Sequence, residues 1–389
     1  MDFELDESHA DLRELAAGLL DRVAETGGMA DGGAVGGGMA SGAPYDVAAW
    51  KAMAQAGLLD ACLPEESGGA GLGAVGLAVL LREVGAHVAE VPAFATIALG
   101  ASPLARHGTP SQRELLRAVA DGELVLTAAV REPGNIGAPR TVARRSGDGY
   151  VLEGVKTAVP YAREAAVILV PATVPGVGTG VFLVPPEADG VSHQAHPTAT
   201  GEPASRIGLD AVWVGDDALL GGRADGVAAA DLDRHAMAGV AATISGVLAG
   251  ALRLTTQHVK SRQQFGRPLA EFQAVTVQIA DVYIAGRALD AAMWAGCWRL
   301  AAGGEPAGRD LDEVLAVAAW HAAGPALRAL YTCQHLHGGL GLDVTYPLHR
   351  FFAWGTQYAH LLGGQQARLD ILGGLLAGAP PLPPAAQAR

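Results

Sequence analysis

The chain has 389 residues, half of them hydrophobic, and this length allows two or three packed regions. Its net charge of −13 argues against a nucleic-acid partner, because phosphate binding needs a basic face. The three cysteines are too few and too scattered for a disulfide framework. No H-E-x-x-H motif is present, and His335 and His337 would point to different faces of a helix or lie in a turn, so we expect no metal site.

The beginning of the chain and its hydropathy bear on its location. Residues 1–12 are acidic and polar, whereas a secretory signal starts with a basic and then an apolar segment. No long run is free of charge and polarity in the manner of a membrane span. We therefore expect a soluble, cytoplasmic protein without a membrane partner, in which Cys62, Cys297 and Cys333 are reduced core thiols.

Residues 1–121 are predicted to form an N-terminal helical domain. Apolar side chains recur at helical spacing in four segments: Leu12–Val23, Val47–Ala56, Val75–Val84 and Gln112–Ala120. The glycine-rich stretch 27–44 has little to bury and is predicted to be a mobile surface loop.

Residues 122–225 are predicted to form a middle β-domain, because the pattern changes to short β-rich runs between turn residues. These runs are Leu124–Val130, Tyr150–Leu152, Ala166–Val170, Val181–Val184 and Val212–Val214. A C-terminal helical domain is predicted for residues 226–378, with helices near 227–260, 270–302, 310–336 and 346–376. Residues 379–389 are predicted to be a flexible tail.

The segment Ala241–Leu252 is apolar around most of its circumference. This pattern is compatible with a C-terminal bundle that packs against other subunits, and equally with a helix in the interior of the chain.

The junction Ser261–Gln273, with the sequence SRQQFGRPLAEFQ, carries the most informative side chains. Gly266 suits a helix C-cap and Pro268 suits the first turn of the next helix. The residues displayed there would be Arg262, Gln264, Phe265 and Gln273. A helix N-terminus at this point would attract phosphate, although an ordinary helix turn with a solvated arginine has the same appearance.

Three segments, in this order, resemble motifs of the acyl-CoA dehydrogenase family. Residues 63–73, LPEESGGAGLG, are similar to its P-E-x-x-G-G-x-G-L turn, and the junction is similar to its R-x-x-F-G…Q signature. Residues 337–341, HGGLG, followed by Tyr346-Pro347, are similar to its G-G-x-G…Y-P segment. The resemblance covers nearly the whole chain and implies a mainly α fold with a central β-barrel-like domain and a C-terminal four-helix bundle.

The resemblance also implies a reaction. In this family FAD accepts a hydride from the β-carbon of an acyl-CoA while a carboxylate removes the α-proton. The electrons usually pass to an electron-transfer flavoprotein, which is therefore a candidate partner.

The usual catalytic glutamate is absent from its expected place. Counting from Gly338-Gly339, the family's Y-E-G-T falls at residues 361–364, so Leu362 stands where glutamate belongs. Some members carry the base in a D-L-E-R segment, which residues 231–234, DLDR, resemble. Asp233 is then the candidate base, although a helix N-terminal aspartate favoured by the macrodipole and paired with Arg234 would look the same.

Four positions that contact the flavin ring in the family are also changed. Arg131 stands in place of the threonine of V-T-E-P-G, and Gly137 in place of a downstream serine. Ala158 replaces the tryptophan of G-x-K-x-W-I-T-N, and Pro160 replaces its threonine. Each change removes a stacking surface or a hydrogen-bond donor.

By contrast, the residues that the family offers to a neighbouring subunit's FAD are retained. The resemblance implies that Arg262, Phe265 and Gln273 reach its pyrophosphate and adenosine, with His335 in place of the usual glutamine. Gly338, Gly339 and Gly341 keep a turn that lets the backbone approach the dinucleotide, or form a plain turn between helices.

This pattern resembles the base-less β-subunits of heteromeric acyl-CoA dehydrogenases of actinobacteria, which are associated with CoA thioesters of steroid side chains. It implies an α2β2 assembly with a homologous catalytic subunit. Two alternatives are a self-sufficient homo-oligomer, which uses Asp233 as base and Arg131 beside the ring, and a catalytically inactive scaffold that binds acyl-CoA.

Overall fold

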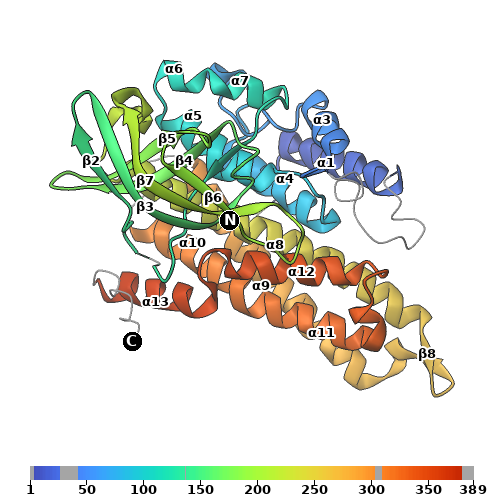
Figure 1. Cartoon of the computed structure of the whole chain (residues 1–389). Helices are drawn as coiled ribbons and strands as arrows, with labels where there is room; N and C mark the ends of the chain where they lie inside the picture. Colours follow the sequence, from blue (N-terminus) through green and yellow to red (C-terminus); the bar gives the residue numbers. More distant parts are fainter. Residues whose placement is uncertain (1–3, 27–42, 136, 303–308, 379–389) are drawn as a thin grey trace. The chain divides into compact units, whose positions relative to one another are not determined.

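The computed structural model describes residues 4–26, 43–135, 137–302 and 309–378 (Figure 1). The chain divides into two compact units. The first consists of Met1–Ala49, Ala74–Val91 and Met237–Leu369, and the second of Trp50–Gly73, Pro92–Ala236 and Asp370–Arg389. The predicted tail 379–389 and most of the predicted loop, residues 27–42, lie outside the described residues.

The first unit is helical. It contains α1 (Glu7–Thr26), α4 (Gly73–His87), α9 (Gln273–Ala302), α10 (Arg309–His321), α11 (Leu327–His337), α12 (Leu348–Leu361) and most of α8 (Val227–Ser261). The single helix predicted for 310–336 is interrupted by the π-helix η7 (Ala322–Ala326), which contains Pro325. A proline removes one backbone donor and clashes with the preceding turn, and the wider π-turn accommodates it.

The last predicted helix, 346–376, is two helices in the structure. Between α12 and α13 (Gly364–Ala377), Gly363 and Gly364 have φ angles of 96° and 80°. Two successive left-handed residues end a helix, so this glycine pair separates α12 from α13.

The long helix α8 is a core helix. It is long and apolar enough to cross a membrane, with a mean hydropathy of 1.6 in its most apolar window, but 78% of that window is buried inside the chain. Its backbone touches that of α4, since a Cβ on Gly246 would lie 1.8 Å from the Arg82 carbonyl oxygen. The segment 241–252 is almost entirely buried within the chain. Its apolar character is therefore explained by the interior of this unit, and needs no subunit contact.

The second unit combines short helices with one sheet. The helices are α3 (Val47–Gln55, of which the last six residues belong here), the π-helix η3 (Phe94–Ala101), α5 (Ser102–His107), α6 (Pro110–Arg113) and α7 (Leu115–Ala120). The helices η3 and α5 were not predicted. The helix η3 packs closely on the sheet, since a Cβ on Gly100 would lie 2.3 Å from the Cβ of Leu126.

The sheet has seven strands in the order β1-β4-β2-β3-β7-β6, with β5 paired to β4. The strands are β1 (Leu126–Ala128), β2 (Val142–Ser146), β3 (Gly149–Pro160), β4 (Val167–Val174), β5 (Gly178–Val184), β6 (Val191–Ala195) and β7 (Ala204–Gly215). The strands β1 and β2 run parallel to β4, and the other pairs are antiparallel. The central β-domain is thus confirmed, although the polar strands β2 and β6 were not predicted.

Candidate functional site

The junction after α8 is a β-hairpin. Strands β8 (Gln263–Gln264) and β9 (Arg267–Pro268) pair across a two-residue turn formed by Phe265 and Gly266, with φ angles of 52° and 80°. Two successive positive φ angles are typical of a type I′ hairpin turn. The prediction that Gly266 caps a helix is therefore wrong, because its left-handed conformation serves a hairpin. Figure 1 shows the hairpin projecting beyond the end of α8.

The hairpin presents the predicted cofactor-binding side chains to solvent. Phe265 is 92% exposed, and Arg262, Gln264 and Gln273 are exposed as well. The Arg262 backbone is held on both sides, since its N–H donates to the His258 carbonyl at 2.8 Å and its carbonyl accepts from the Leu269 N–H at 2.9 Å. Within the described part of the chain, no carboxylate pairs with the Arg262 guanidinium. This positive charge is therefore available to an anionic ligand.

An aromatic cluster supports the tip of the hairpin. The ring of Phe265 lies edge-on to that of Phe272, with centroids 6.2 Å apart and an interplanar angle of 74°. The Arg267 guanidinium lies over the Phe272 ring, 4.1 Å from its centroid, which is the geometry of a cation–π contact. The exposed ring of Phe265 is thus supported by neighbours on the same hairpin and on the turn before α9.

The glycine-rich segment follows the C-terminus of α11. His335 in the last turn is exposed, and the 3-10 helix η8 (Gly338–Leu342) begins with Gly338 at a φ of 58°. No atom lies within 4 Å of where a Cβ on Gly338 or Gly339 would be, so a ligand can approach the backbone there. A Cβ on Gly341, in contrast, would lie 2.7 Å from the Gln334 carbonyl oxygen. Close packing within the chain therefore accounts for Gly341.

The structure brings these two segments together. The ring of His258, one turn before Arg262 on α8, stacks on the ring of His337 at the end of α11, with centroids 4.3 Å apart and an interplanar angle of 21°. Sequence analysis did not predict this contact, which joins residues far apart in the chain. We call the exposed residues of the two segments the half-site, namely Arg262, Gln264, Phe265, Gln273, His335, Gly338 and Gly339.

The position of the usual catalytic glutamate offers no proton acceptor. Leu362 follows the last residue of α12 and is partly buried. Its hydrocarbon side chain can contribute only packing. As the sequence indicated, leucine stands where the family has its catalytic base, and this position supplies no other proton acceptor.

The carboxylates of the DLDR segment lie in the second turn of α8. Asp233 is exposed, whereas Asp231 is buried beside Arg106 Nε at 3.1 Å and His107 Nε2 at 3.0 Å. Burial by itself would raise the pKa of Asp231, but the hydrogen bond from His107 and the nearby positive charges lower it overall. Asp231 is thus held ionised by structural partners, which leaves Asp233 as the candidate base of this segment.

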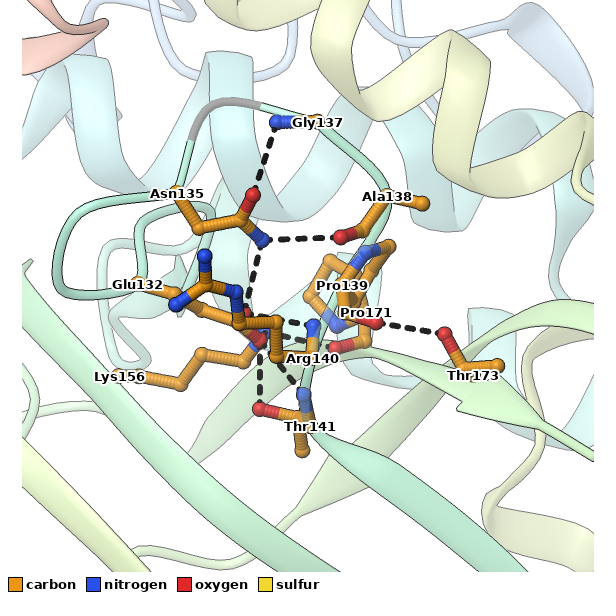
Figure 2. Close-up of polar contacts among 10 residues, drawn as sticks. All are labelled: Glu132, Asn135, Gly137, Ala138, Pro139, Arg140, Thr141, Lys156, Pro171 and Thr173. Atoms are coloured by element: carbon orange, nitrogen blue, oxygen red, sulfur yellow. Dashed lines mark hydrogen bonds and ion pairs between the residues drawn. The ribbon is translucent and has the colours of Figure 1, made fainter. Parts of the chain in front are cut away.

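The loop after β1 is closed by its own polar groups. Figure 2 shows the buried carboxylate of Glu132, which accepts from Lys156 Nζ at 2.8 Å, from Thr141 Oγ1 at 2.6 Å and from the Arg140 N–H at 2.7 Å. Burial would raise the pKa of Glu132. The charge and hydrogen bond of Lys156, together with the side-chain and backbone hydrogen bonds of Thr141, lower it to about 2. The carboxylate is therefore part of a saturated structural network.

Asn135 completes this loop. Its side-chain amide donates to Glu132 Oε2 at 3.1 Å and to the Ala138 carbonyl at 2.9 Å, while its oxygen accepts from the Gly137 N–H at 3.2 Å (Figure 2). The Gly137 N–H is thus already engaged within the loop. We call Glu132, Asn135, Arg140, Thr141 and Lys156 the Glu132 network.

The strand that follows carries the other altered positions. Ala158 lies at an irregularity in the pairing of β3 with β7 and has a positive φ of 50°. Pro160 has no N–H, and its carbonyl accepts from Thr127 Oγ1 at 2.7 Å. These residues present no aromatic face and no side-chain donor where the family resemblance places the flavin ring.

The two regions fit different parts of FAD. The half-site combines a cation that no carboxylate of the described residues pairs with, an exposed flat ring and an open glycine backbone. These features suit a pyrophosphate and an adenosine. Ala158 and Pro160 offer a flavin ring no stacking surface and no side-chain donor, and the Gly137 N–H is already engaged by Asn135. The chain therefore fits one end of the dinucleotide better than the other.

Comparisons with known proteins agree with this geometry. Residues 38–123 match the family described as "Acyl-CoA dehydrogenase, N-terminal domain", and residues 227–373 match its C-terminal domain. The protein named acyl-CoA dehydrogenase FadE28 of Mycobacterium tuberculosis is 40% identical over 327 residues, which cover 83% of this chain and 91% of that relative.

Two solved structures are similar along nearly the whole chain. A variant of the Tcur3481-Tcur3483 steroid ACAD has a TM-score of 0.87 at 39% identity, and the match covers 96% of this chain and 99% of that one. The ChsE4-ChsE5 complex from Mycobacterium tuberculosis has a TM-score of 0.86 at 30% identity, over 98% of this chain and 100% of that one.

Proposed function

Because the chain belongs to the acyl-CoA dehydrogenase family, we propose that it is the cofactor-completing subunit of a heteromeric FAD-dependent acyl-CoA dehydrogenase. In this role it completes the FAD site of a homologous catalytic subunit, which supplies the flavin-ring contacts and the catalytic base. The observation that carries this proposal is the contrast between the open half-site and the closed Glu132 network.

The chain's own residues have defined tasks in this proposal. FAD, when bound, supplies the chemistry of hydride acceptance. Arg262 donates charge-assisted hydrogen bonds to a phosphate, and Phe265 offers an apolar wall to the flat part of the ligand. Gly338 and Gly339 let the ligand approach the backbone, because they carry no side chain.

Proton removal falls to the partner under this proposal. Leu362 cannot accept a proton, and Asp231 is engaged by Arg106 and His107. A carboxylate of the catalytic subunit would therefore remove the α-proton of the acyl-CoA.

The similar structures support the assembly and suggest a substrate class. One is a complex of ChsE4 with ChsE5, and the other is called a steroid ACAD with a two-part name. We infer an α2β2 assembly with a CoA thioester of a steroid side chain as substrate, and an electron-transfer flavoprotein as electron acceptor. Turnover of steroid side-chain and straight-chain acyl-CoA by the purified complex would test the substrate. Equal efficiency with both would contradict it.

A cytoplasmic location is inferred as well. The buried position of α8 and the three free, buried cysteines support it. Fractionation of the source cells would test this inference.

Flavin content tests the proposed function directly. We expect the full chain alone to be colourless, and to give a yellow complex when it is co-expressed with its catalytic subunit. A yellow protein from the chain alone, reducible by an acyl-CoA, would support the self-sufficient dehydrogenase instead. Colourless protein in both preparations would leave the inactive acyl-CoA-binding scaffold.

Arg262→Ala tests the half-site within that complex. A hydrogen bond to a charged group contributes about 1.5–3 kcal/mol, so FAD affinity should fall by about 10–100-fold. Arg223→Ala, at an exposed arginine outside the half-site, is the matched control and should leave FAD affinity unchanged. Unchanged FAD affinity in Arg262→Ala would contradict the assignment.

One observation favours a second candidate function. The Asp233 carboxylate interacts electrostatically with Lys156 and so lies close to the Glu132 network, where a self-sufficient enzyme would need its base. If the chain alone turned over acyl-CoA, Asp233→Asn should reduce kcat by about 100-fold or more, because general-base catalysis contributes that much. Full activity in Asp233→Asn would exclude Asp233 as the base.

A further inference from the structure

Three aromatic rings connect the two segments of the half-site. His337 lies between His258, at 4.3 Å and 21°, and Tyr346, at 5.3 Å and 51° between centroids and ring planes. His337 is 6% exposed and His258 is partly exposed. The rings come from the end of α8, the end of α11 and the segment before α12, so the stack joins three separate parts of the first unit.

The hydrogen bonds of His337 define its protonation state. Its Nδ1 lies 2.9 Å from the Cys333 carbonyl oxygen, which can only accept, so Nδ1 carries the proton. Its Nε2 is buried and has no hydrogen-bond partner among the residues that the structure describes. A second proton on this ring would add a buried, unpaired donor and a charge, so the neutral ring is favoured.

His258 is linked to Arg262 through the backbone as well as by position. His258 lies in the last turn of α8, and Arg262 is the first residue after the helix. The His258 carbonyl accepts from the Arg262 N–H, and the Arg262 carbonyl accepts from the Leu269 N–H at the far end of the hairpin. A change in the position of His258 would therefore alter the direction in which Arg262 leaves the helix.

We propose that His258 and His337 are positioning residues of the half-site, and that their ring stack fixes Arg262 in the direction that meets a phosphate of the partner's FAD. This inference rests on the proposed function and adds to it two residues that contact no ligand themselves. It also assigns a task to His337, two residues from the exposed His335 of the half-site.

The groups that face the stack make it sensitive to acid. Burial lowers the pKa of His258, and the nearby His337 and Arg262 lower it further. Burial also lowers the pKa of His337. Tyr346 and Cys333, which contact His337, have pKa values raised by burial and are neutral at physiological pH. No carboxylate of the described residues is paired with either histidine ring.

The sign of the pH effect follows from these directions. Both histidines have a pKa below the ordinary 6.5 in the folded chain, so the folded stack binds fewer protons than the separated rings. The stack is fully present above about pH 6.5 and is weakened as the pH falls below that value. FAD retention by the complex should fall in the same range.

The test uses the complex with its catalytic subunit, and FAD affinity is measured at about pH 8 and about pH 5.5. The wild-type complex should bind FAD more weakly at the lower pH, by up to about tenfold, because pH 5.5 lies about one pH unit below the ordinary pKa of histidine. His258→Ala should bind about tenfold more weakly at both. His258→Phe keeps a flat ring without a titratable group, so it should restore binding relative to His258→Ala and reduce the pH dependence to the share of His337. His360→Phe, at an exposed histidine of α12, is the control and should behave as the wild type.

Two outcomes would overturn the proposal. If FAD binds more tightly at low pH and His258→Phe abolishes this gain, then His258 is a cationic phosphate ligand and not a neutral positioning ring. If His258→Ala equals the wild type at both values of pH, the stack has no influence on the half-site.

Amide hydrogen exchange of the full chain alone separates this proposal from the proposed function. His258→Ala should speed exchange of the Arg262 and Leu269 amides by about tenfold, and His258→Phe should leave it unchanged. Unchanged exchange in His258→Ala would refute positioning even if FAD binds. If His258→Ala speeds exchange in the chain alone but the wild-type complex never binds FAD, the positioning role stands and the proposed function is refuted.

Discussion

The half-site and the Glu132 network satisfy their polar groups in opposite ways. Arg262, Gln264 and Phe265 face solvent, and no carboxylate of the described chain pairs with Arg262. Glu132, in contrast, is buried and accepts from Lys156, Thr141, Arg140 and Asn135. The polar groups of the half-site thus face solvent and are open to a ligand, whereas the Glu132 carboxylate has its hydrogen-bond partners within the chain.

Under the proposed function, this difference would allow the fold to be retained while a cofactor site is divided between two subunits. The loop that would face a flavin ring keeps its shape through Glu132 and Lys156, and so it does not depend on a ring for its stability. The hairpin keeps its shape through its I′ turn and the Phe272 ring. Its exposed groups do not contribute to that shape and are open to an anionic ligand. Mutations in the two regions should therefore affect different quantities.

The largest effect is expected from Lys156→Met. This change removes the buried partner of Glu132 and leaves an uncompensated carboxylate, so the free energy of unfolding should fall by about 3–5 kcal/mol. Urea denaturation of the full chain would measure it. The double variant Glu132→Gln/Lys156→Met removes the unpaired charge and should recover much of the loss. A single variant within about 1 kcal/mol of the wild type would show that the network is not structural.

Lowering the pH should also reduce the free energy of unfolding through the Glu132 network, by somewhat less than Lys156→Met does. The pKa of Glu132 is lowered from the ordinary 4.5 to about 2 in the folded chain. Its contribution, roughly 3 kcal/mol, is present above about pH 4.5 and is lost as the pH falls toward 2. Unfolding free energies measured between these limits should decline more steeply in the wild type than in Glu132→Gln/Lys156→Met. Parallel curves would contradict the low pKa.

The glycine-rich segment contains both a glycine needed for packing and a glycine open to a ligand, so stability and FAD binding can be compared within one motif. Gly341→Ala should destabilise the chain by about 1–3 kcal/mol, because the new Cβ would overlap the Gln334 carbonyl oxygen. Gly339→Ala meets open space and should leave stability unchanged, while it lowers FAD retention in the complex. Thermal unfolding and flavin content would measure the two effects. The assignment of Gly341 to packing fails if both variants are equally stable.

The smallest effect is expected at the tip of the hairpin. Phe265 has a φ of 52°, a conformation that asparagine adopts more readily than phenylalanine. Phe265→Asn should therefore raise the free energy of unfolding of the isolated chain by up to about 1 kcal/mol, and weaken FAD retention in the complex. Phe265→Ala lacks the ring but keeps an unfavourable backbone, and should show only the loss of FAD. A gain of stability in both would mean that the ring itself is destabilising.

Much of the fold could be predicted because its long helices repeat their apolar residues regularly. The predicted 227–260 corresponds to α8, and the central β-domain contains a strand at each predicted run. The strands β2 (VARRS) and β6 (VSHQA) were missed because they have few apolar residues to mark them. The π-helices η3 and η7 leave no periodic signal, since each is one widened stretch within helical sequence.

Candidate site residues could be proposed from the sequence, but the contacts between them could not. Motif resemblance pointed to Arg262, Phe265, Gly338 and Gly339, which are exposed as a ligand-facing role requires, and to Gly341, which is buried. Gly266 was predicted to cap a helix and not to form a hairpin turn, because the turn also needs Phe265 at a positive φ, which is uncommon for phenylalanine. The contact of His258 with His337 depends on how α8 and α11 pack, which no local pattern records.

All three cysteines of this protein are buried, so its surface has no reactive thiol. Burial raises the pKa of Cys62 and Cys297 to about 12 and that of Cys333 to about 11, so hardly any thiolate exists near neutral pH. A cysteine introduced at the exposed Gln264 would therefore react with a maleimide dye long before the native thiols. A fluorophore at this position would report, through its quenching, when the hairpin meets a flavin or a second polypeptide.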